Sequence, residues 1–221
     1  MCRFLMVRSA APLDPQPFLV SFADLAERSP APDGDPQADG WGISWLGESG
    51  QWDSRKYTDP IWESVSLFDR FPESRSFCLH ARSASSPRLK DNVEFNQPFV
   101  GGRYAFVFNG FLEGISLPFP VPGRIGSQKI WELVRARLAG AGGRRSLTEV
   151  HALLNRRSRR VQALNMGLTD GGRLYGLSQF DGHEDYYRCR VHRSPDLKMI
   201  CSGPLEGFEF RPAPVNRVFS L

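Results

Sequence analysis

The sequence has no long apolar run. The chain has 221 residues, of which 41% are hydrophobic, yet no stretch approaches the roughly 20 apolar residues of a membrane-spanning helix. Its basic and apolar start, MCRFLMV, stops at Val7 and is followed by Pro12, Asp14, Pro15 and Pro17. An export signal needs a longer apolar segment and small residues at a cleavage site. We therefore expect a cytoplasmic protein without a membrane segment.

Cysteine is also scarce. The four cysteines are Cys2, Cys78, Cys189 and Cys201. A small secreted scaffold would carry a much higher density of paired cysteines. No pair has the CxxC spacing of a structural zinc site, so we expect no metal and no cofactor. Three of the thiols fall in strand-like segments, where they would behave as small buried hydrophobes. Cys2 needs another explanation.

The excess of positive charge is small. The net charge is +4, and much of the basicity lies in two clusters, Arg144-Arg145 and the arginines between 156 and 160. These clusters lack the interleaved aromatic residues of a base-stacking surface. A solvated basic face explains them better than a nucleic-acid site, and we expect no nucleic-acid partner.

Apolar periodicity predicts both strands and helices. Strand patterns cover residues 2–7, 41–46, 76–85, 103–110, 163–170, 173–180, 186–193 and 197–203. Helix patterns cover 14–28, 60–71 and two segments that begin near Ser127 and Ser146, and a loop rich in Pro, Asp and Gly covers 29–40. Strands at both ends with helices between them predict an α+β layered domain rather than a doubly wound parallel sheet. The length suits one domain over residues 1–221.

Three local signals predict where elements begin and end. Ser127 is expected to be the N-cap of its helix, and Ser146 with Glu149 forms the pattern of a capping box. The dipeptide Asn109-Gly110 predicts a tight turn at the end of the strand over 103–110.

Cys2 has a chemical use if Met1 is removed, which the small side chain at position 2 permits. The thiol and a free α-amine then belong to one residue. Their reference pKa values are about 8.5 and about 7.7–8.0. The amine can accept the thiol proton and later return it to a leaving group, with no histidine or aspartate partner. Taken alone, a cysteine at position 2 does not separate this use from an incidental one.

Seven short motifs occur in one order along the chain. They are MCRFL, DGWGISW, HARSAS, NQPF, FNGFLEG, LNMGLTDGGRLYG and SGPLEGF. Together they resemble the class II glutamine amidotransferase family, and most of all its short stand-alone members, which are similar to the γ-glutamyl hydrolase of ergothioneine biosynthesis. These proteins are N-terminal-nucleophile hydrolases. The resemblance implies a four-layer α/β/β/α sandwich of two antiparallel sheets, which the predicted element order fits.

The resemblance also assigns roles to individual residues. It implies that Cys2 attacks a side-chain amide and forms a thioester, and that Asn109 and Gly110 supply the two N–H donors of an oxyanion hole. Arg82 matches an arginine that holds the substrate carboxylate, a task that suits the fork of a guanidinium group. Ser83 and Ser85 fall where the family places further substrate contacts. The motif around Asp39 and the nearby His80 are interpreted as scaffold.

One position departs from the family. The helix after the oxyanion strand normally begins Ser-Asp-Ser/Thr-Glu, and its aspartate binds the α-amino group of glutamine. Here Gly126 replaces that aspartate and Gln128 replaces the glutamate. An ammonium group in a site without an anionic partner is strongly disfavoured. Glu113 could substitute, the substrate could lack a free amine, or catalysis could be lost.

The expected substrate is a small-molecule amide, either glutamine or a γ-glutamyl compound. The predicted domain has no second half that could receive ammonia. We therefore expect either a separate synthase chain that accepts the ammonia or an amidohydrolase in its own right. The alternative from another class is a catalytically silent domain that binds a ligand or regulates a partner.

Overall fold

The fold contains two antiparallel β-sheets. The computed structural model describes residues 1–28, 31–32, 34 and 36–221, so part of the predicted loop over 29–40 lies outside the described residues. The seven-stranded sheet has the order β11 (Arg211–Pro212), β9 (Arg190–Arg193), β10 (Leu197–Cys201), β1 (Arg3–Leu13), β4 (Ser74–Ala81), β2 (Trp41–Leu46) and β3 (Trp52–Tyr57). The five-stranded sheet has the order β12 (Val218–Ser220), β8 (Leu174–Leu177), β7 (Arg160–Thr169), β6 (Tyr104–Glu113) and β5 (Phe99–Gly101).

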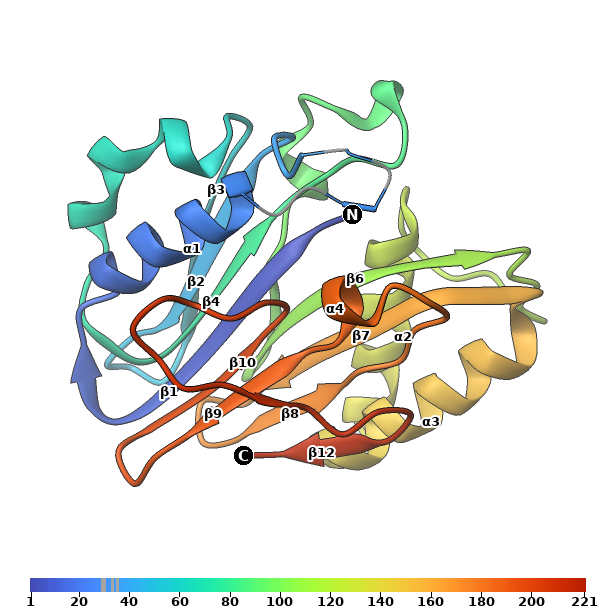
Figure 1. The fold of residues 1–221 in the computed structure, drawn as a ribbon. Coiled ribbons are helices and arrows are strands. Elements are labelled where there is room, and N and C mark those ends of the chain that lie inside the picture. Colours follow the sequence, from blue (N-terminus) through green and yellow to red (C-terminus); the bar gives the residue numbers. More distant parts are fainter. Residues whose placement is uncertain (29–30, 33, 35) are drawn as a thin grey trace.

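Helices cover the two outer faces of the sheet pair (Figure 1). Helix α1 (Gln16–Arg28) packs on the seven-stranded sheet, whereas α2 (Gly126–Leu138) and α3 (Gly143–Arg157) pack on the five-stranded sheet. A single short turn of helix, α4 (Glu184–Tyr187), precedes β9. The predicted four-layer α/β/β/α sandwich is confirmed.

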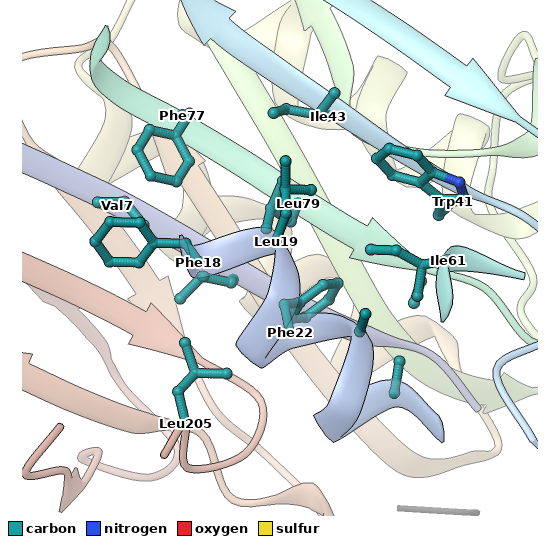
Figure 2. Packing of buried hydrophobic residues seen from close by; sticks show 14 of the residues in the cluster. Val7, Phe18, Leu19, Phe22, Trp41, Ile43, Ile61, Phe77, Leu79 and Leu205 are labelled. Atoms are coloured by element: carbon teal, nitrogen blue, oxygen red, sulfur yellow. The ribbon is translucent and has the colours of Figure 1, made fainter. Parts of the chain in front are cut away.

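The seven-stranded sheet and α1 share one hydrophobic core. Figure 2 shows Phe18, Leu19 and Phe22 of α1 directed at the sheet, where they meet side chains such as Phe77 and Leu79 of β4. All five are at most 7% exposed. Because burying one such side chain contributes about 1.5–3 kcal/mol, this face holds α1 on the sheet.

Among the helices of the described residues, none has the length and hydropathy of a membrane-spanning segment.

A second core lies between the two sheets. Met6 of β1 and Cys78 of β4 face Val107 of β6, and all three are fully buried. The sheets approach each other closely at Gly167 of β7, where a Cβ atom would overlap Met6 Sδ and Val107 Cγ2. Glycine is therefore required here by space.

The third core joins α2 and α3 to the outer face of the five-stranded sheet. It includes Ile130 and Val134 of α2 and Leu147 and Val150 of α3, which the predicted helix patterns placed on the buried faces.

The predicted helix over 60–71 is wrong. Two 3₁₀ turns occupy Ile61–Glu63 and Val65–Arg70, and Val65 is 55% exposed. The Ser64 hydroxyl between them donates to the Pro60 carbonyl (3.2 Å) and accepts from Trp41 Nε1 (3.0 Å). Such local side-chain hydrogen bonds compete with those of an α-helix.

The predicted turn at Asn109-Gly110 is also wrong, because β6 continues to Glu113. Asn109 pairs with Asn165 and Gly110 with Leu164 of β7, and a register shift follows between Phe111 and Leu112. Pairing with a distant strand overrides the local turn preference.

Both predicted helix caps are shifted. Ile125 is the N-cap of α2, and the Gln128 side chain accepts from the Arg124 and Ile125 backbone N–H groups (2.8 and 3.4 Å). Gly142 is the N-cap of α3, so Ser146 lies buried inside the helix. Ser127 likewise lies within the first turn of α2 rather than before it.

We expect Gly167→Ala to lower the free energy of unfolding by about 1–3 kcal/mol, the usual cost of overpacking. The added methyl group would force the two sheets apart at Met6. Denaturant unfolding would measure the change. In the control Gly140→Ala the new Cβ meets open space, so stability should be unchanged or rise by up to about 1 kcal/mol. Equal effects of both variants would contradict the close approach of the sheets.

Candidate active site

A cavity of about 570 Å³ opens where the start of β1 meets three other segments. These are the loop after β4, the second half of β6 and the start of α2. Its lining includes the predicted site residues Cys2, Arg82, Ser83, Ser85, Gly110 and Gly126. The size is within the range typical of small-molecule sites.

The Met1-Cys2 segment is held in the cavity by hydrogen bonds. The Cys2 backbone N–H donates to Asn109 Oδ1 (3.2 Å), and Cys2 Sγ lies 3.6 Å from the Ser83 carbonyl oxygen. The Met1 ammonium donates to Ser83 Oγ (2.8 Å), and the Met1 carbonyl accepts from the Tyr186 hydroxyl (3.1 Å). The nitrogen of Cys2 is therefore fixed beside its own thiol and beside Asn109.

Burial controls the acidity of the four thiols. Burial raises the pKa of the Cys2 thiol above its usual range, although the nearby N-terminal ammonium opposes this effect. Burial raises the pKa of Cys78, Cys189 and Cys201 to about 12, and these three thiols lie in the core as predicted. Cys2 is the thiol that reaches the cavity, and it needs a base to become a thiolate.

Asn109 offers an unused hydrogen-bond donor beneath Cys2. Its Oδ1 accepts from the Cys2 backbone, and this fixes the orientation of the amide. Its Nδ2 is buried and has no hydrogen-bond partner among the described residues. Next to it, Gly110 lines the cavity, and a Cβ at this position would overlap the Ala163 carbonyl of β7. A buried donor without a partner costs stability, which is characteristic of a site that awaits an acceptor.

The backbone just before Asn109 is held by two buried side chains. Gln97 Oε1 accepts from the Phe108 N–H (2.7 Å), and Gln97 Nε2 donates to the Phe108 carbonyl (3.1 Å). His80 Nε2 lies 3.3 Å from the same carbonyl. Gln97 belongs to the NQPF motif, but its contact with the Phe108 peptide became apparent only from the fold.

Arg82 is a buried cation without an ion pair among the described residues. Three of its N–H groups donate to neutral oxygens, the Leu89 carbonyl (2.6 Å), Asn96 Oδ1 (3.3 Å) and the Asp39 carbonyl (3.4 Å). Because a guanidinium has five N–H donors, two remain. The Asp39 carboxylate instead binds the Ala84 N–H (2.7 Å) and Lys90 Nζ (2.9 Å). Burial lowers the pKa of Arg82, and Asp39 and Asp91 oppose this effect without forming an ion pair with it, so the two unused donors favour an anion in the cavity.

The positions of Gly126 and Glu113 show whether Glu113 could supply the carboxylate that is absent at Gly126. Gly126 lines the cavity, and a Cβ there would meet no atom within 4 Å. Glu113 forms ion pairs with Arg159 (3.3 Å) and Arg160 (3.6 Å) and is not part of the described lining. Its carboxylate is thus committed elsewhere and does not replace the missing aspartate.

No group of three or more His, Cys, Asp or Glu side chains in the described ranges is arranged to hold a metal ion. The lining nevertheless offers several polar groups for an organic ligand, among them Ser83, Ser85 and Ser127.

We expect the stability of the protein to decrease in acid partly because of His80. Burial lowers the pKa of His80 to about 3, whereas an unfolded histidine titrates near 6.5. As the pH falls from about 6.5 towards 3, the unfolded state gains a proton that the folded state excludes, so the free energy of unfolding decreases by an amount on the order of a few kcal/mol. Unfolding curves measured between pH 7 and 4 should show a shallower decrease for His80→Gln. The control His183→Gln, at an exposed histidine, should follow the wild type. A slope unchanged in His80→Gln would contradict this account.

No family model and no curated protein matches this chain. Solved structures do match it over 99% of its length. A glutamine aminotransferase class-II domain protein from Silicibacter pomeroyi has 16% identity, with 94% of that chain covered and a TM-score of 0.64. Glutamine phosphoribosylpyrophosphate amidotransferase from B. subtilis has 14% identity and a TM-score of 0.69, with 47% of that chain covered. A predicted glutamine amidotransferase from Pseudomonas aeruginosa has 17% identity, 96% coverage and a TM-score of 0.54. The resemblance predicted from the motifs is thus confirmed at the level of the fold, which is that of the class II glutamine amidotransferases.

Proposed function

We propose that this protein is an N-terminal-cysteine amide hydrolase of the glutaminase or γ-glutamyl type. The observation that carries the proposal is the position of Cys2. It faces the same cavity as Arg82 and Gly110, and its nitrogen is hydrogen-bonded to Asn109. The candidate nucleophile Cys2, the candidate oxyanion donor Gly110 and the cationic anchor Arg82 therefore border one space, and the second candidate donor, Asn109, is held beside Cys2 by a hydrogen bond although it is not part of the described lining.

The proposed reaction begins with removal of Met1. The Cys2 nitrogen then becomes an α-amine at the place where it now donates to Asn109. This amine takes the thiol proton, which the buried thiol does not release readily by itself. Removal of Met1 also enlarges the cavity, because Met1 is part of its lining.

The thiolate then attacks the carbonyl carbon of the substrate amide. The carbonyl π electrons move to oxygen, and the oxyanion accepts hydrogen bonds from Asn109 Nδ2 and the Gly110 N–H. Collapse of this intermediate breaks the C–N bond, and the Cys2 ammonium gives its proton to the leaving nitrogen. The products of this half-reaction are an amine or ammonia and a thioester on Cys2.

Water completes the reaction. The Cys2 amine takes a proton from water as the oxygen attacks the thioester, and breakage of the C–S bond releases the carboxylic acid. The proton returns to the thiolate, so that the enzyme is restored. Throughout both half-reactions the two remaining N–H groups of Arg82 hold a carboxylate elsewhere on the substrate.

We expect Cys2→Ala to abolish turnover, because the attacking sulfur and its thioester are lost. The control Cys189→Ala should remain active, since Cys189 is buried in the core. Intact mass should show that Met1 is absent. An electrophilic glutamine analogue, used with and without an N-acetyl group, should add its mass to the N-terminal peptide. Labelling of Cys78, Cys189 or Cys201 with Cys2 unmodified would refute the assignment, and retention of Met1 in an active protein would refute the amine as base.

Arg82 and Asn109 should affect different kinetic constants. Arg82→Lys keeps the charge but loses the fork, so it should mainly raise KM. Asn109→Ala removes a donor used in the transition state, so kcat should decrease about 100-fold or more with little change in KM. Steady-state kinetics would separate the two effects, with circular dichroism to confirm folding. The reverse pattern would mean that the two roles are exchanged.

A further inference from the structure

The described residues that line the cavity carry positive charge and no negative charge. Apart from the Met1 ammonium, Arg82 carries the only charge among the described lining side chains, and no carboxylate is among them. Three of the acidic groups nearby are already paired, and Asp91 acts on Arg82 electrostatically without forming an ion pair with it. Asp39 binds Lys90, Glu94 binds Arg124 (3.2 Å), and Glu113 binds two arginines. A substrate carboxylate would find a cationic partner in this cavity, whereas a substrate ammonium would find neutral oxygens such as those of Ser83, Ser85 and Ser127 but no carboxylate among the described lining residues.

The rest of the lining contains both polar and apolar side chains. Cys2, Gly110 and Arg82 account for the reacting amide and for one carboxylate. Any further part of the substrate therefore meets the remaining wall, which includes Ile115, Ile125 and Ile130 together with Phe111. Phe111 and Ile115 are 41% and 40% exposed, so apolar surface is available at the mouth. Gly126 adds open space beside it.

We propose that the substrate is an amide that carries a carboxylate and, where glutamine has its ammonium, an uncharged and apolar substituent that lies over Gly126 towards Ile115 and Ile125. An N-acylated glutamine belongs to this class. An ammonium moved from water into this cavity loses hydration and gains no anionic partner. An acyl group has no charge to desolvate and covers exposed apolar surface. This inference rests on the proposed function for the reaction but not for binding.

The first experiment measures binding separately from turnover. Calorimetry with the Cys2→Ala variant, after its mass has shown that Met1 is absent, would compare L-glutamine, N-acetyl-L-glutamine, N-hexanoyl-L-glutamine and glutaramate, the analogue without an amine. We expect each uncharged compound to bind about 10- to 100-fold more tightly than glutamine, the range of one ionic hydrogen bond. The hexanoyl compound should bind best.

Glutamine binding that equals or exceeds that of the uncharged compounds would overturn the inference, as would failure of all four to bind. Turnover by the wild type is measured in parallel. If the acylated compounds bind preferentially but are not hydrolysed, the substrate class stands and the proposed hydrolase function fails.

A second experiment changes the charge at Gly126. Open space at this position allows Gly126→Asp without a clash. We expect this variant to bind glutamine about 10- to 100-fold more tightly and the hexanoyl compound more weakly. Gly126→Asn is the matched control, because it fills the same space without the charge and should weaken the hexanoyl compound alone. Glutamine affinity that is unchanged in Gly126→Asp, or that rises equally in Gly126→Asn, would overturn the inference.

Discussion

The candidate site depends on how closely the two sheets pack. Cys2 precedes a strand of one sheet, and Asn109 lies in a strand of the other. Gly167 allows Met6, four residues after Cys2, to pack against the second sheet without an intervening side chain. This contact fixes the start of β1 over β6. The hydrogen bond from the Cys2 nitrogen to Asn109 therefore follows from the packing of the core, and a shift between the sheets would separate Cys2 from Asn109.

Buried polar groups then give the site its orientation. The Phe108 peptide is held from both sides by Gln97 and contacted by His80, so Asn109 projects from a backbone with little freedom. Such buried groups are costly unless they are hydrogen-bonded. Of the side-chain atoms of Gln97, His80 and Asn109, Asn109 Nδ2 and His80 Nδ1 have no partner among the described residues. Donors that are fixed before the reaction need not reorganise during it. Asn109 Nδ2 would gain that advantage if it is an oxyanion donor, as proposed.

The sequence predicted the layers of the fold and the residues near Cys2 better than it predicted where individual helices and turns begin and end. The helix over 14–28 and the buried faces of α2 and α3 follow from periodicity alone, because each buries one continuous apolar stripe. The turn at Asn109-Gly110 and the cap at Ser127 failed because strand pairing and the Gln128 side chain decide those positions. Strand β3 was not predicted, since WDSRKY is largely polar and forms an edge with little apolar pattern. The role of Gln97 depends on a contact of its side chain with the Phe108 peptide of β6, which no periodic pattern of apolar residues encodes.

The charge of Arg82 links the binding of a carboxylate in the cavity to the acidity of the Cys2 thiol. In the unliganded protein, burial raises the pKa of Cys2, and the positive charges of the N-terminus and of Arg82 oppose that effect. A substrate carboxylate on Arg82 would cancel part of this opposition, so the thiol would become less acidic as the substrate binds. If Cys2 is the nucleophile, as proposed, binding of that carboxylate would disfavour its thiolate. The proposed α-amine base belongs to the same residue, so it would serve the thiol without another buried ionisable group.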